Sequence, residues 1–266
     1  MKFLNFFFLS KIFERLNNFL AKKIFKIFKV FFVETNLSKL PITNYPLNDL
    51  EEELIYSRRF STNNNLPYMS YSHLPHLLEL IYEREEKLNF FDYGGGNLNL
   101  YFYLNKKFEK IYYYFKDQNK VEEKVKDIIR NDGLKNLFVN NNNIQSHIDI
   151  LYFGSSLQYV ENYKEELSLF FKKTKYILIA QSPFFQNENL DEKIILKQIN
   201  MHPNINYLYL FNFDNFINFM DKNGYELVEK NINKVTKFLN FKNFNRQKYK
   251  NINMYDLLFK LKNEIK

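Results

Sequence analysis

The chain has 266 residues, 45% of them hydrophobic and 26% charged, which favours one globular α/β domain with appended segments over a disordered chain. It has no cysteine, which excludes disulfide frameworks, thiolate metal sites and a cysteine nucleophile, and favours a reducing, cytoplasmic compartment. The net charge is +8, but lysines are spread along the chain and mixed with acids, so we predict no nucleic-acid partner.

The first predicted element is a basic amphipathic helix over residues 1–33. Seven basic residues stand there against the single acid Glu14, and apolar residues recur at helical spacing. No uncharged run in it exceeds eight residues, whereas a helix that crosses a bilayer needs about 20. Two interpretations stay open. The helix packs its apolar face on the protein, or it makes a peripheral contact with the inner face of a membrane.

Residues 1–70 together are expected to form an N-terminal extension. Prolines and polar residues predict loops around a short helix at about 48–58. From Ser72, apolar residues at helical spacing predict a helix that leads into the main domain.

From Leu88 onward, strands and helices alternate. The expected strands are 88–91, 111–115, 137–139, 148–153, 176–180 and 226–229, and the expected helices are 98–108, 121–131, 164–172 and 214–223. This order predicts an α/β fold over residues 71–235, with a Rossmann-like, mostly parallel sheet flanked by helices. Such a sheet binds ligands outside the carboxyl ends of its strands.

Two later segments are interpreted as additions to this domain. The residues after Ala180 form a long insertion, and loops at strand ends carry specificity. Its candidate acceptor-site residues are Phe184, Phe185, Gln198, His202 and Tyr207. The run from Lys234 holds nine basic residues against two acidic ones, so we interpret residues 236–266 as a basic C-terminal extension that forms a surface helix or a partner contact.

The sequence FFDYGGGN at 90–97 holds three of the six glycines, Gly94, Gly95 and Gly96. They follow the first strand of the alternating region and precede its first helix. Glycines there permit positive φ and let a ligand approach the main chain, and a helix start offers N–H groups to an anion. This context favours a ligand loop over the alternative, a tight structural turn.

Asp117 stands at the end of the next strand, 23 residues after Gly94. A carboxylate at that place accepts both hydroxyls of a ribose in Rossmann-like sheets, while a helix-capping role is the alternative. Position 99 is Asn, so the outer glycine of a phosphate-cradling G-x-G-x-x-G is missing. The turn therefore fits a nucleoside with a carboxylate better than a pyrophosphate.

Several motifs in the same order resemble a known family. They are DYGGGNLNLYFY, KDQNKV, FGSSLQYVENY, ILIAQSPF, Gln198 and GYELVE. They resemble the S-adenosylmethionine-dependent methyltransferases whose signature runs D-F-G-G-G, E-Q-P, S-G-S-L-Q-Y, a strand ending in T-P-F, and G-Y. The resemblance covers about residues 70–230, and SLQY at 156–159 is its most specific part. It implies the Rossmann-like methyltransferase fold, S-adenosylmethionine as cofactor, and an association with surface-polysaccharide synthesis.

The resemblance also implies residue roles. Gly94, Gly95 and Gly96 would border the methionine part of the cofactor, and Asp92 would steady their loop. Asp117 would take the ribose hydroxyls, with Gln118 beside the adenine. The far wall, where the methyl group meets its acceptor, would consist of Ser155, Ser156, Gln158 and Tyr159.

The chain departs from the family pattern at four positions. Asp117 replaces Glu, Asn119 replaces Pro, and Ser182 replaces the Thr before the final Pro of its motif. Leu98 occupies the place of a later glycine, and we expect its side chain to narrow the cofactor pocket or to shift the first helix.

Methyl transfer needs few catalytic groups, because alignment of acceptor and methyl alone supplies about 7–11 kcal/mol. A hydroxyl acceptor also needs a base with a pKa near 7. Tyr159 and His202 are the candidate catalytic residues, and His73 and His76 could border the same opening. His147 precedes a strand at the amino end of the sheet and is the weakest candidate. No residues have metal-ligand spacing, so we predict no metal.

The resemblance thus implies S-adenosylmethionine-dependent O-methylation of a small molecule or a sugar. One alternative is a degenerate, non-catalytic module of the same fold that acts in assembly or at a membrane surface, favoured by Leu98 and the basic N-terminus. Another is a nicotinamide-dependent oxidoreductase, which the missing outer glycine disfavours. The oligomeric state is not predicted.

Overall fold

The structure is a computed structural model that describes most of the chain from residue 87 onward. The described residues are 31–41, 74, 78, 87–108, 110–139, 147–199, 206–233, 241 and 243–262. The helix expected at 48–58 and residues 1–30 lie outside this part of the chain. Of the helix expected from Ser72, Leu74 and Leu78 are described, and both are helical and buried.

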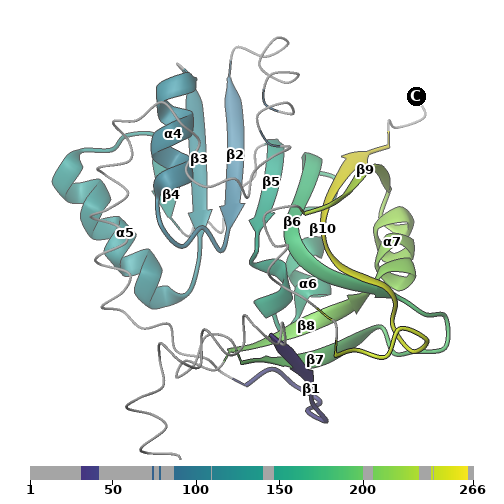
Figure 1. The fold of residues 1–266 in the computed structure, drawn as a ribbon. Coiled ribbons are helices and arrows are strands. Elements are labelled where there is room, and N and C mark those ends of the chain that lie inside the picture. The colour runs from purple at the N-terminus through teal and green to yellow at the C-terminus, as the bar shows by residue number, and fades with distance from the viewer. Residues whose placement is uncertain are drawn as a thin grey trace, which may run out of the picture.

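Ten described strands form one sheet (Figure 1). They are β1 (Phe32–Glu34), β2 (Leu88–Tyr93), β3 (Ile111–Lys116), β4 (Leu137–Val139), β5 (Ile148–Gly154), β6 (Thr174–Gln186), β7 (Lys193–Gln198), β8 (Asn206–Asn212), β9 (Tyr225–Ile232) and β10 (Lys250–Leu261). The body of the sheet runs in the order β4-β3-β2-β5-β6-β10-β9. Its strands are parallel from β4 to β6, and β10 is antiparallel to both of its neighbours.

Helices cover both faces of this body. They are α4 (Asn99–Lys107), α5 (Asn119–Asp132), α6 (Tyr163–Ser168) and α7 (Phe213–Lys222), with a short 3₁₀ turn, η2, at Leu157–Tyr159. Residues of α4 and α5 share one buried core with the sheet, and residues of α6 and α7 share a second core on the other face. The predicted Rossmann-like α/β fold, a mostly parallel sheet flanked by helices, is confirmed.

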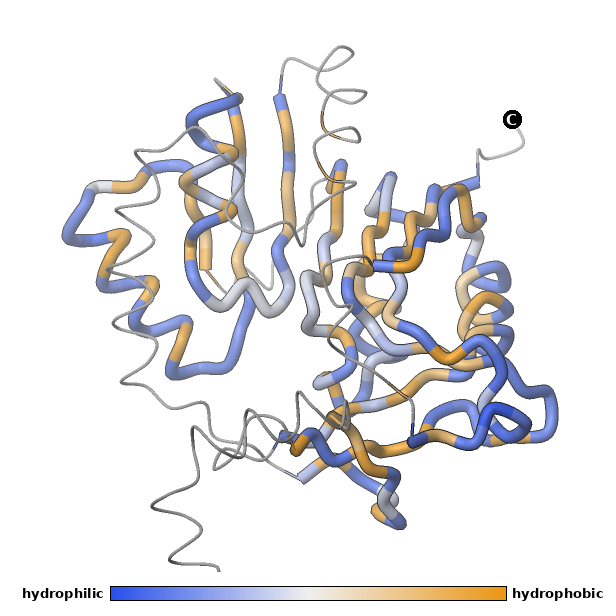
Figure 2. Tube along the Cα trace, viewed as in Figure 1, coloured by the Kyte–Doolittle hydropathy of each residue, from blue (hydrophilic) through white to orange (hydrophobic). Residues whose placement is uncertain are grey.

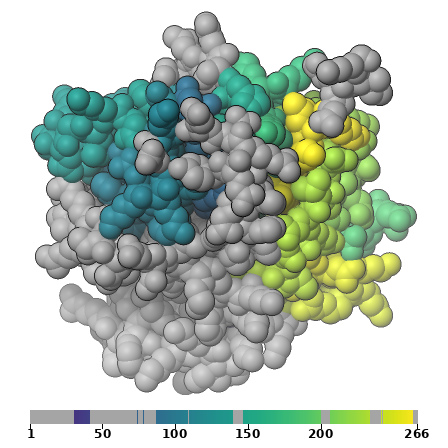
Figure 3. Space-filling model, turned by 90° about the horizontal axis from the view of Figure 1, so that it is seen from above, coloured from purple at the N-terminus to yellow at the C-terminus, as the bar shows by residue number. Residues whose placement is uncertain are grey.

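The helices follow from their local sequence. In α5, Val121 and Val125 are buried at helical spacing while charged residues fill the outer side, so hydrophilic and hydrophobic positions alternate along it (Figure 2). Gly133 ends this helix with φ of 64°, a conformation that favours glycine. The helix expected at 164–172 is shorter and ends at Ser168; the chain then turns through Lys172, with φ of 66°, before it enters β6. Viewed from above, the blue and teal residues lie on one side of the molecule and the green and yellow residues on the other (Figure 3).

The expected insertion after Ala180 is mostly strand. β6 pairs with β5 as far as Ala180, continues past the end of β5, and there pairs with β8 at Phe184 and Phe185. β8 pairs antiparallel with β7, and β7 with β1. We call β1, β7 and β8 the side branch. Alternate side chains of its strands, such as Leu196, Leu208 and Leu210, are buried in a third core and stabilise the side branch.

The expected C-terminal extension was wrong. Residues 250–261 form β10, which fills the place between β6 and β9 in the sheet. Three of the nine basic residues that suggested a surface segment, Lys250, Lys260 and Lys262, stand at or next to the ends of this strand, while Leu257 and Phe259 are fully buried. The main domain therefore does not end at residue 235, and the strand at 225–232 is not the last one.

The end of the predicted N-terminal helix also needs correction. Phe32 and Val33 belong to β1, where Phe32 pairs with Gln198. Phe31 and Phe32 are buried in the core of the side branch. Their apolar side chains therefore pack in the core beneath β1, and they do not form the apolar face of a helix. In the described residues, no helix is long and apolar enough to cross a membrane.

Candidate functional site

The carboxyl ends of β2, β3 and β5 meet at one edge of the sheet, and the loops that follow them carry most of the predicted site residues. After β2 the chain turns through Gly94 and Gly96, whose φ angles are 76° and 53°. Left-handed backbone of this kind favours glycine. Gly94 and Gly96 are thus favoured by the turn itself, and we call residues 94–96 the glycine loop.

The three glycines differ in what surrounds them. A Cβ atom on Gly94 would lie 2.3 Å from Cβ of Ser156, and one on Gly95 would lie 2.5 Å from the ring of Phe115 and 2.6 Å from Oδ2 of Asp92. A Cβ on Gly96 would meet none of the described residues within 4 Å. Gly94 and Gly95 are therefore packed against the protein, whereas the part of the chain that the structure describes leaves the Cα side of Gly96 open.

Asp117 binds the glycine loop directly. Its Oδ2 accepts a hydrogen bond of 2.8 Å from the Gly96 N–H, and its Oδ1 accepts one of 2.7 Å from the Gln118 N–H. The N-cap residue of α5 is Gln118, which makes no side-chain cap bond. Burial raises the pKa of Asp117, while these two N–H groups lower it. The carboxylate thus joins the ends of β2 and β3, and it is not the cap of α5.

Asp92 lies beneath the loop and is 2% exposed. Its Oδ2 accepts a hydrogen bond from the Tyr113 hydroxyl. Burial raises the pKa of Asp92 to about 7; the bond from Tyr113 opposes the rise and the Asp117 carboxylate adds to it. The predicted supporting position of Asp92 matches this placement, because its carboxyl group packs under Gly95.

Leu98 does not enter the space above the loop. It is 0% exposed and belongs to the core that α4 and α5 share with the sheet. It is the N-cap residue of α4 with φ of −85°, a conformation open to any residue. The expectation that Leu98 narrows the pocket was wrong, because its side chain points into the core.

The loop after β5 forms the opposite wall. Ser155 has φ of 59°, and its N–H donates to the Ala180 carbonyl. The hydroxyl of Ser156 donates to the Tyr93 carbonyl, which ties this wall to the start of the glycine loop. Ser155 and Ser156 are partly exposed, so both remain candidates for contact with a ligand.

Gln158 occupies a different place from the one predicted. It is 1% exposed, and its amide nitrogen lies 3.0 Å from the Ser155 carbonyl and 3.2 Å from the Ser155 hydroxyl. Its amide oxygen accepts a bond of 2.9 Å from the Ser182 hydroxyl. The side chain is therefore engaged inside the protein, behind the wall that it was predicted to line.

Tyr159 is the exposed member of SLQY. Its side chain is 42% exposed, and its hydroxyl lies 3.3 Å from Oε1 of Gln198 at the end of β7. The protein around the hydroxyl raises the pKa of Tyr159 to about 12. At neutral pH this residue is a phenol that can donate a hydrogen bond but cannot act as a general base.

The other candidates fall into three groups. His202, His73 and His76 lie outside the described residues. Gln118 is exposed at the start of α5. Phe184 and Phe185 are 0% exposed, one in each of two cores, so the proposal that they line an acceptor site was wrong.

His147 stands at the amino end of β5, and its Nε2 lies 3.3 Å from Oδ1 of Asp149. That is the opposite edge of the sheet from the glycine loop, as predicted for this histidine. Among the described residues, no group of three or more His, Asp and Glu side chains is arranged to hold a metal ion.

Sequence reasoning missed two buried acids near the site. Glu122, which is 3% exposed, accepts a bond of 3.1 Å from the Asp117 N–H. Its position in the first turn of α5, five residues after Asp117, was the signal that could have indicated it. Asp256 lies in β10 and accepts a bond of 2.8 Å from the Gln181 N–H, a contact across 75 residues that no local pattern indicates.

Comparison with known proteins agrees with this arrangement at the level of the fold. No family model matches the sequence, and no curated protein matches it significantly. An S-adenosylmethionine-dependent methyltransferase from Clostridium acetobutylicum has a similar structure, with a TM-score of 0.51 and 13% sequence identity, over 81% of this chain and 99% of that one. The chain has a methyltransferase fold.

A second similar structure is the 1,6-didemethyltoxoflavin-N1-methyltransferase of Burkholderia thailandensis, solved with 1,6-didemethyltoxoflavin and S-adenosylhomocysteine. The TM-score is 0.49 and the identity 10%, over 88% of this chain and 99% of that chain. In the methyltransferase fold of the present chain, the glycine loop, Asp117 and the Ser155–Tyr159 wall share the carboxyl edge of the sheet, where sheets of this type bind their ligands.

Proposed function

We propose that the protein is an S-adenosylmethionine-dependent methyltransferase whose cofactor lies across the carboxyl ends of β2, β3 and β5. One observation carries the proposal. The Gly96 N–H is held by the Asp117 carboxylate, while no described residue lies within 4 Å of the place that a Cβ on Gly96 would take. A loop that needs left-handed glycine and keeps one side clear beside a fixed carboxylate is suited to a nucleoside ligand.

The residues present fit this cofactor. Each carboxylate oxygen of Asp117 accepts one bond from the protein, and a carboxylate has about four acceptor positions in all. Bonds within the described residues thus leave two positions for the ribose hydroxyls. Asp117 and Glu122 place two carboxylates beside the loop, which favours a ligand that carries a sulfonium and an ammonium group.

In this proposal Gly94, Gly95 and Gly96 border the methionine part, and Gln118 lies beside the adenine. Bound S-adenosylmethionine would supply a methyl group on a sulfonium, which is a good leaving group. The wall at Ser155, Ser156 and Tyr159 would exclude water and orient the acceptor, with Tyr159 as a hydrogen-bond donor. Gln158 supports this wall from behind.

The acceptor class is a finer proposal. A hydroxyl on a small molecule or a sugar, in surface-polysaccharide synthesis, is supported by the resemblance of SLQY and its neighbouring motifs. A hydroxyl acceptor needs a base, and the phenol of Tyr159 is not one at neutral pH. His202 stays the candidate base. Cytoplasmic location and membrane contact through residues 1–33 stay predictions.

The non-catalytic alternative loses its main support, because Leu98 is buried in the core and its side chain does not cover the glycine loop. Isothermal titration calorimetry with S-adenosylmethionine, S-adenosylhomocysteine and NAD tests the proposal. We expect both sulfur compounds to bind and NAD not to bind. Failure of both sulfur compounds to bind would overturn the proposed function, and binding of NAD alone would favour an oxidoreductase.

A further inference from the structure

Two residues other than glycine have left-handed backbone at the same level of neighbouring strands. Ser155 directly follows β5 and has φ of 59°, and Gln181 in β6 has φ of 53°. The residues before them, Gly154 and Ala180, are paired in the sheet. Strained backbone of this kind persists only where surrounding groups hold it, and it gathers at functional sites.

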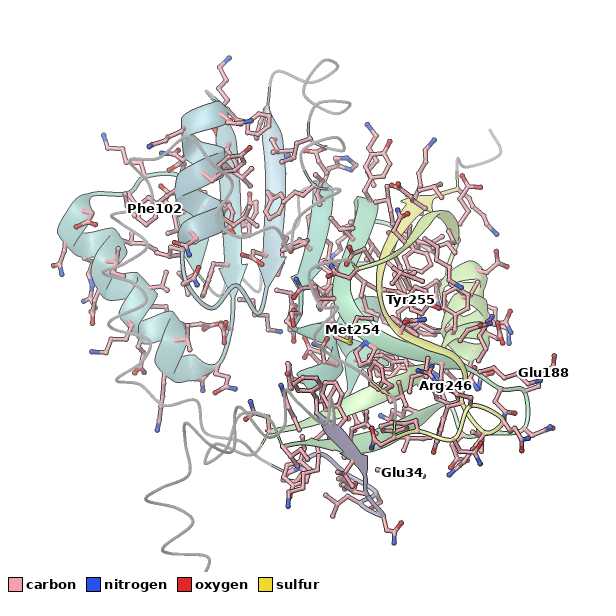
Figure 4. The ribbon with its side chains drawn as sticks, viewed as in Figure 1. Glu34, Phe102, Glu188, Arg246, Met254 and Tyr255 are labelled. Atoms are coloured by element: carbon pink, nitrogen blue, oxygen red, sulfur yellow. The ribbon has the colours of Figure 1, made fainter. Side chains whose placement is uncertain are left out.

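Gln181 is held from β10. The pairing of β6 with β10 shifts register between Tyr255 and Leu257, which marks a bulge opposite Asp256. The extra N–H of a bulge lacks a strand partner, and here the Gln181 N–H donates to Oδ1 of Asp256 at 2.8 Å. Asp256 is 3% exposed, and the side-chain amide of Asn233 donates to both of its oxygens at 2.9 Å. Figure 4 labels its neighbours Met254 and Tyr255 on β10, beside β6.

Ser155 is held by Gln158, which also reaches the bulge. The amide nitrogen of Gln158 lies 3.0 Å from the Ser155 carbonyl and 3.4 Å from the Gln181 carbonyl. Its amide oxygen accepts from Ser182, the residue after Gln181. A single buried amide therefore joins both left-handed residues.

This network ends at the glycine loop. Ser156 follows Ser155, and its hydroxyl donates to the Tyr93 carbonyl. Ser156 packs so closely on Gly94 that a Cβ there would lie 2.3 Å from the Ser156 Cβ. A shift of Ser155 would therefore move the wall against the loop.

We propose that Gln158 and Asp256 are positioning residues that fix the cofactor site from behind. Asp256 holds the β6 bulge, and Gln158 joins that bulge to Ser155. The next residue, Ser156, contacts the glycine loop and so fixes the loop relative to the bulge. This inference rests on the proposed function and extends it. It makes the C-terminal strand β10 part of the support of the site, although no residue of β10 is proposed to contact the ligand.

The test compares variants of the full chain in two measurements. S-adenosylhomocysteine affinity is measured by calorimetry, well below the melting temperature of each variant. Hydrogen–deuterium exchange is measured for peptides that cover the glycine loop and the wall, residues 93–98 and 154–160. The variants are Gln158→Met, Asp256→Ala and the milder Ser182→Ala. Tyr225→Phe is the matched control, because it removes a buried hydrogen bond to the Thr174 carbonyl at the start of β6.

We expect Gln158→Met and Asp256→Ala to bind S-adenosylhomocysteine at least tenfold more weakly, and Ser182→Ala about threefold to tenfold more weakly. Exchange in both peptides should rise in these variants and not in Tyr225→Phe. Asp256→Asn should lose less affinity than Asp256→Ala, since its amide oxygen can still accept from the Gln181 N–H, although its amide nitrogen can no longer accept from the Asn233 amide. If Asp256→Ala does not fold, Gln158→Met and Ser182→Ala decide the test.

The proposal is overturned if these variants bind and exchange as Tyr225→Phe does, or if Asp256→Asn loses as much affinity as Asp256→Ala. A wild-type protein that does not bind S-adenosylhomocysteine contradicts the proposed function instead. In that case the exchange of the two peptides still decides whether Gln158 and Asp256 hold the loop.

Discussion

Substitution of Gly96 by alanine should separate backbone strain from ligand contact. Gly96 has φ of 53°, and a Cβ there meets no described residue within 4 Å. Gly133, at the end of α5, provides a matched control, because its φ is 64° and a Cβ there also meets no residue that the structure describes. Helix α5 begins at the carboxyl edge of the sheet and ends away from it (Figure 1), so Gly133 lies far from the proposed site.

The energetic cost of both substitutions follows from the left-handed backbone. Alanine in that conformation costs about 1–2 kcal/mol, and for domains near this size each kcal/mol lowers the melting temperature by about 2–4 °C. Gly96→Ala and Gly133→Ala should therefore be destabilised to a similar, moderate extent. Gly95→Ala should be less stable than either, because its Cβ would overlap the buried ring of Phe115.

Calorimetry with S-adenosylhomocysteine then distinguishes the two positions. We expect Gly96→Ala to bind at least tenfold more weakly than the wild type, because its methyl group projects into the space assigned to the ligand. Gly133→Ala should bind with unchanged affinity. Equal affinities for the two variants would refute the reasoning, since the open side of Gly96 would then not face the ligand.

Three further predictions concern the acids and the core beneath the loop. Asp117→Ala should weaken S-adenosylhomocysteine binding at least tenfold. The control Asp127→Ala, which removes an exposed carboxylate from α5, should not change the affinity. Equal affinities of the two variants would argue against the binding of the ribose hydroxyls by Asp117. The pKa of Asp92 is raised to about 7 in the folded protein, so wild-type stability should fall as pH rises from about 4 through about 7. Asp92→Asn should remove that loss, so its free energy of unfolding should exceed that of the wild type by up to about 4 kcal/mol at pH 8 and equal it near pH 4. Urea unfolding of both proteins at the two pH values measures this, and a difference that does not change with pH would contradict the prediction. Leu98→Ala should cost about 2–5 kcal/mol of stability in the same unfolding assay, yet leave ligand affinity within threefold, and a gain in affinity would mean that Leu98 does restrict the pocket.

The glycine loop and Asp117 could be predicted because their signals are local. Each follows a short apolar strand and precedes a helix, and parallel strands bring such ends to one edge of a sheet. The direct bond between Asp117 and Gly96 is a consequence of that placement, and it required no long-range information beyond the strand order.

β10 could not be predicted, because its evidence is not local. Its lysines suggested a surface segment, while the burial of Leu257 depends on pairing with β6, some 80 residues earlier. The strand expected at 176–180 is likewise longer in the structure, where it includes Pro183 although proline removes a backbone donor. In the structure Pro183 lies just after the bulge at Gln181, and β6 continues to Gln186.

The role of Gln158 shows a different limit of the sequence. Its motif indicated that the residue belongs to the site, but not whether its amide faces a ligand or the protein. That distinction depends on Ser155, Gln181 and Ser182, which converge on the amide only after β5 and β6 are paired.

A crystal structure of the protein with S-adenosylhomocysteine would test the central claim most directly. The account predicts the ribose hydroxyls on the Asp117 carboxylate and the amino-acid part of the ligand against Gly96, with the sulfur facing the wall that carries Tyr159. A ligand bound elsewhere, or at this edge without contact to Asp117, would contradict it.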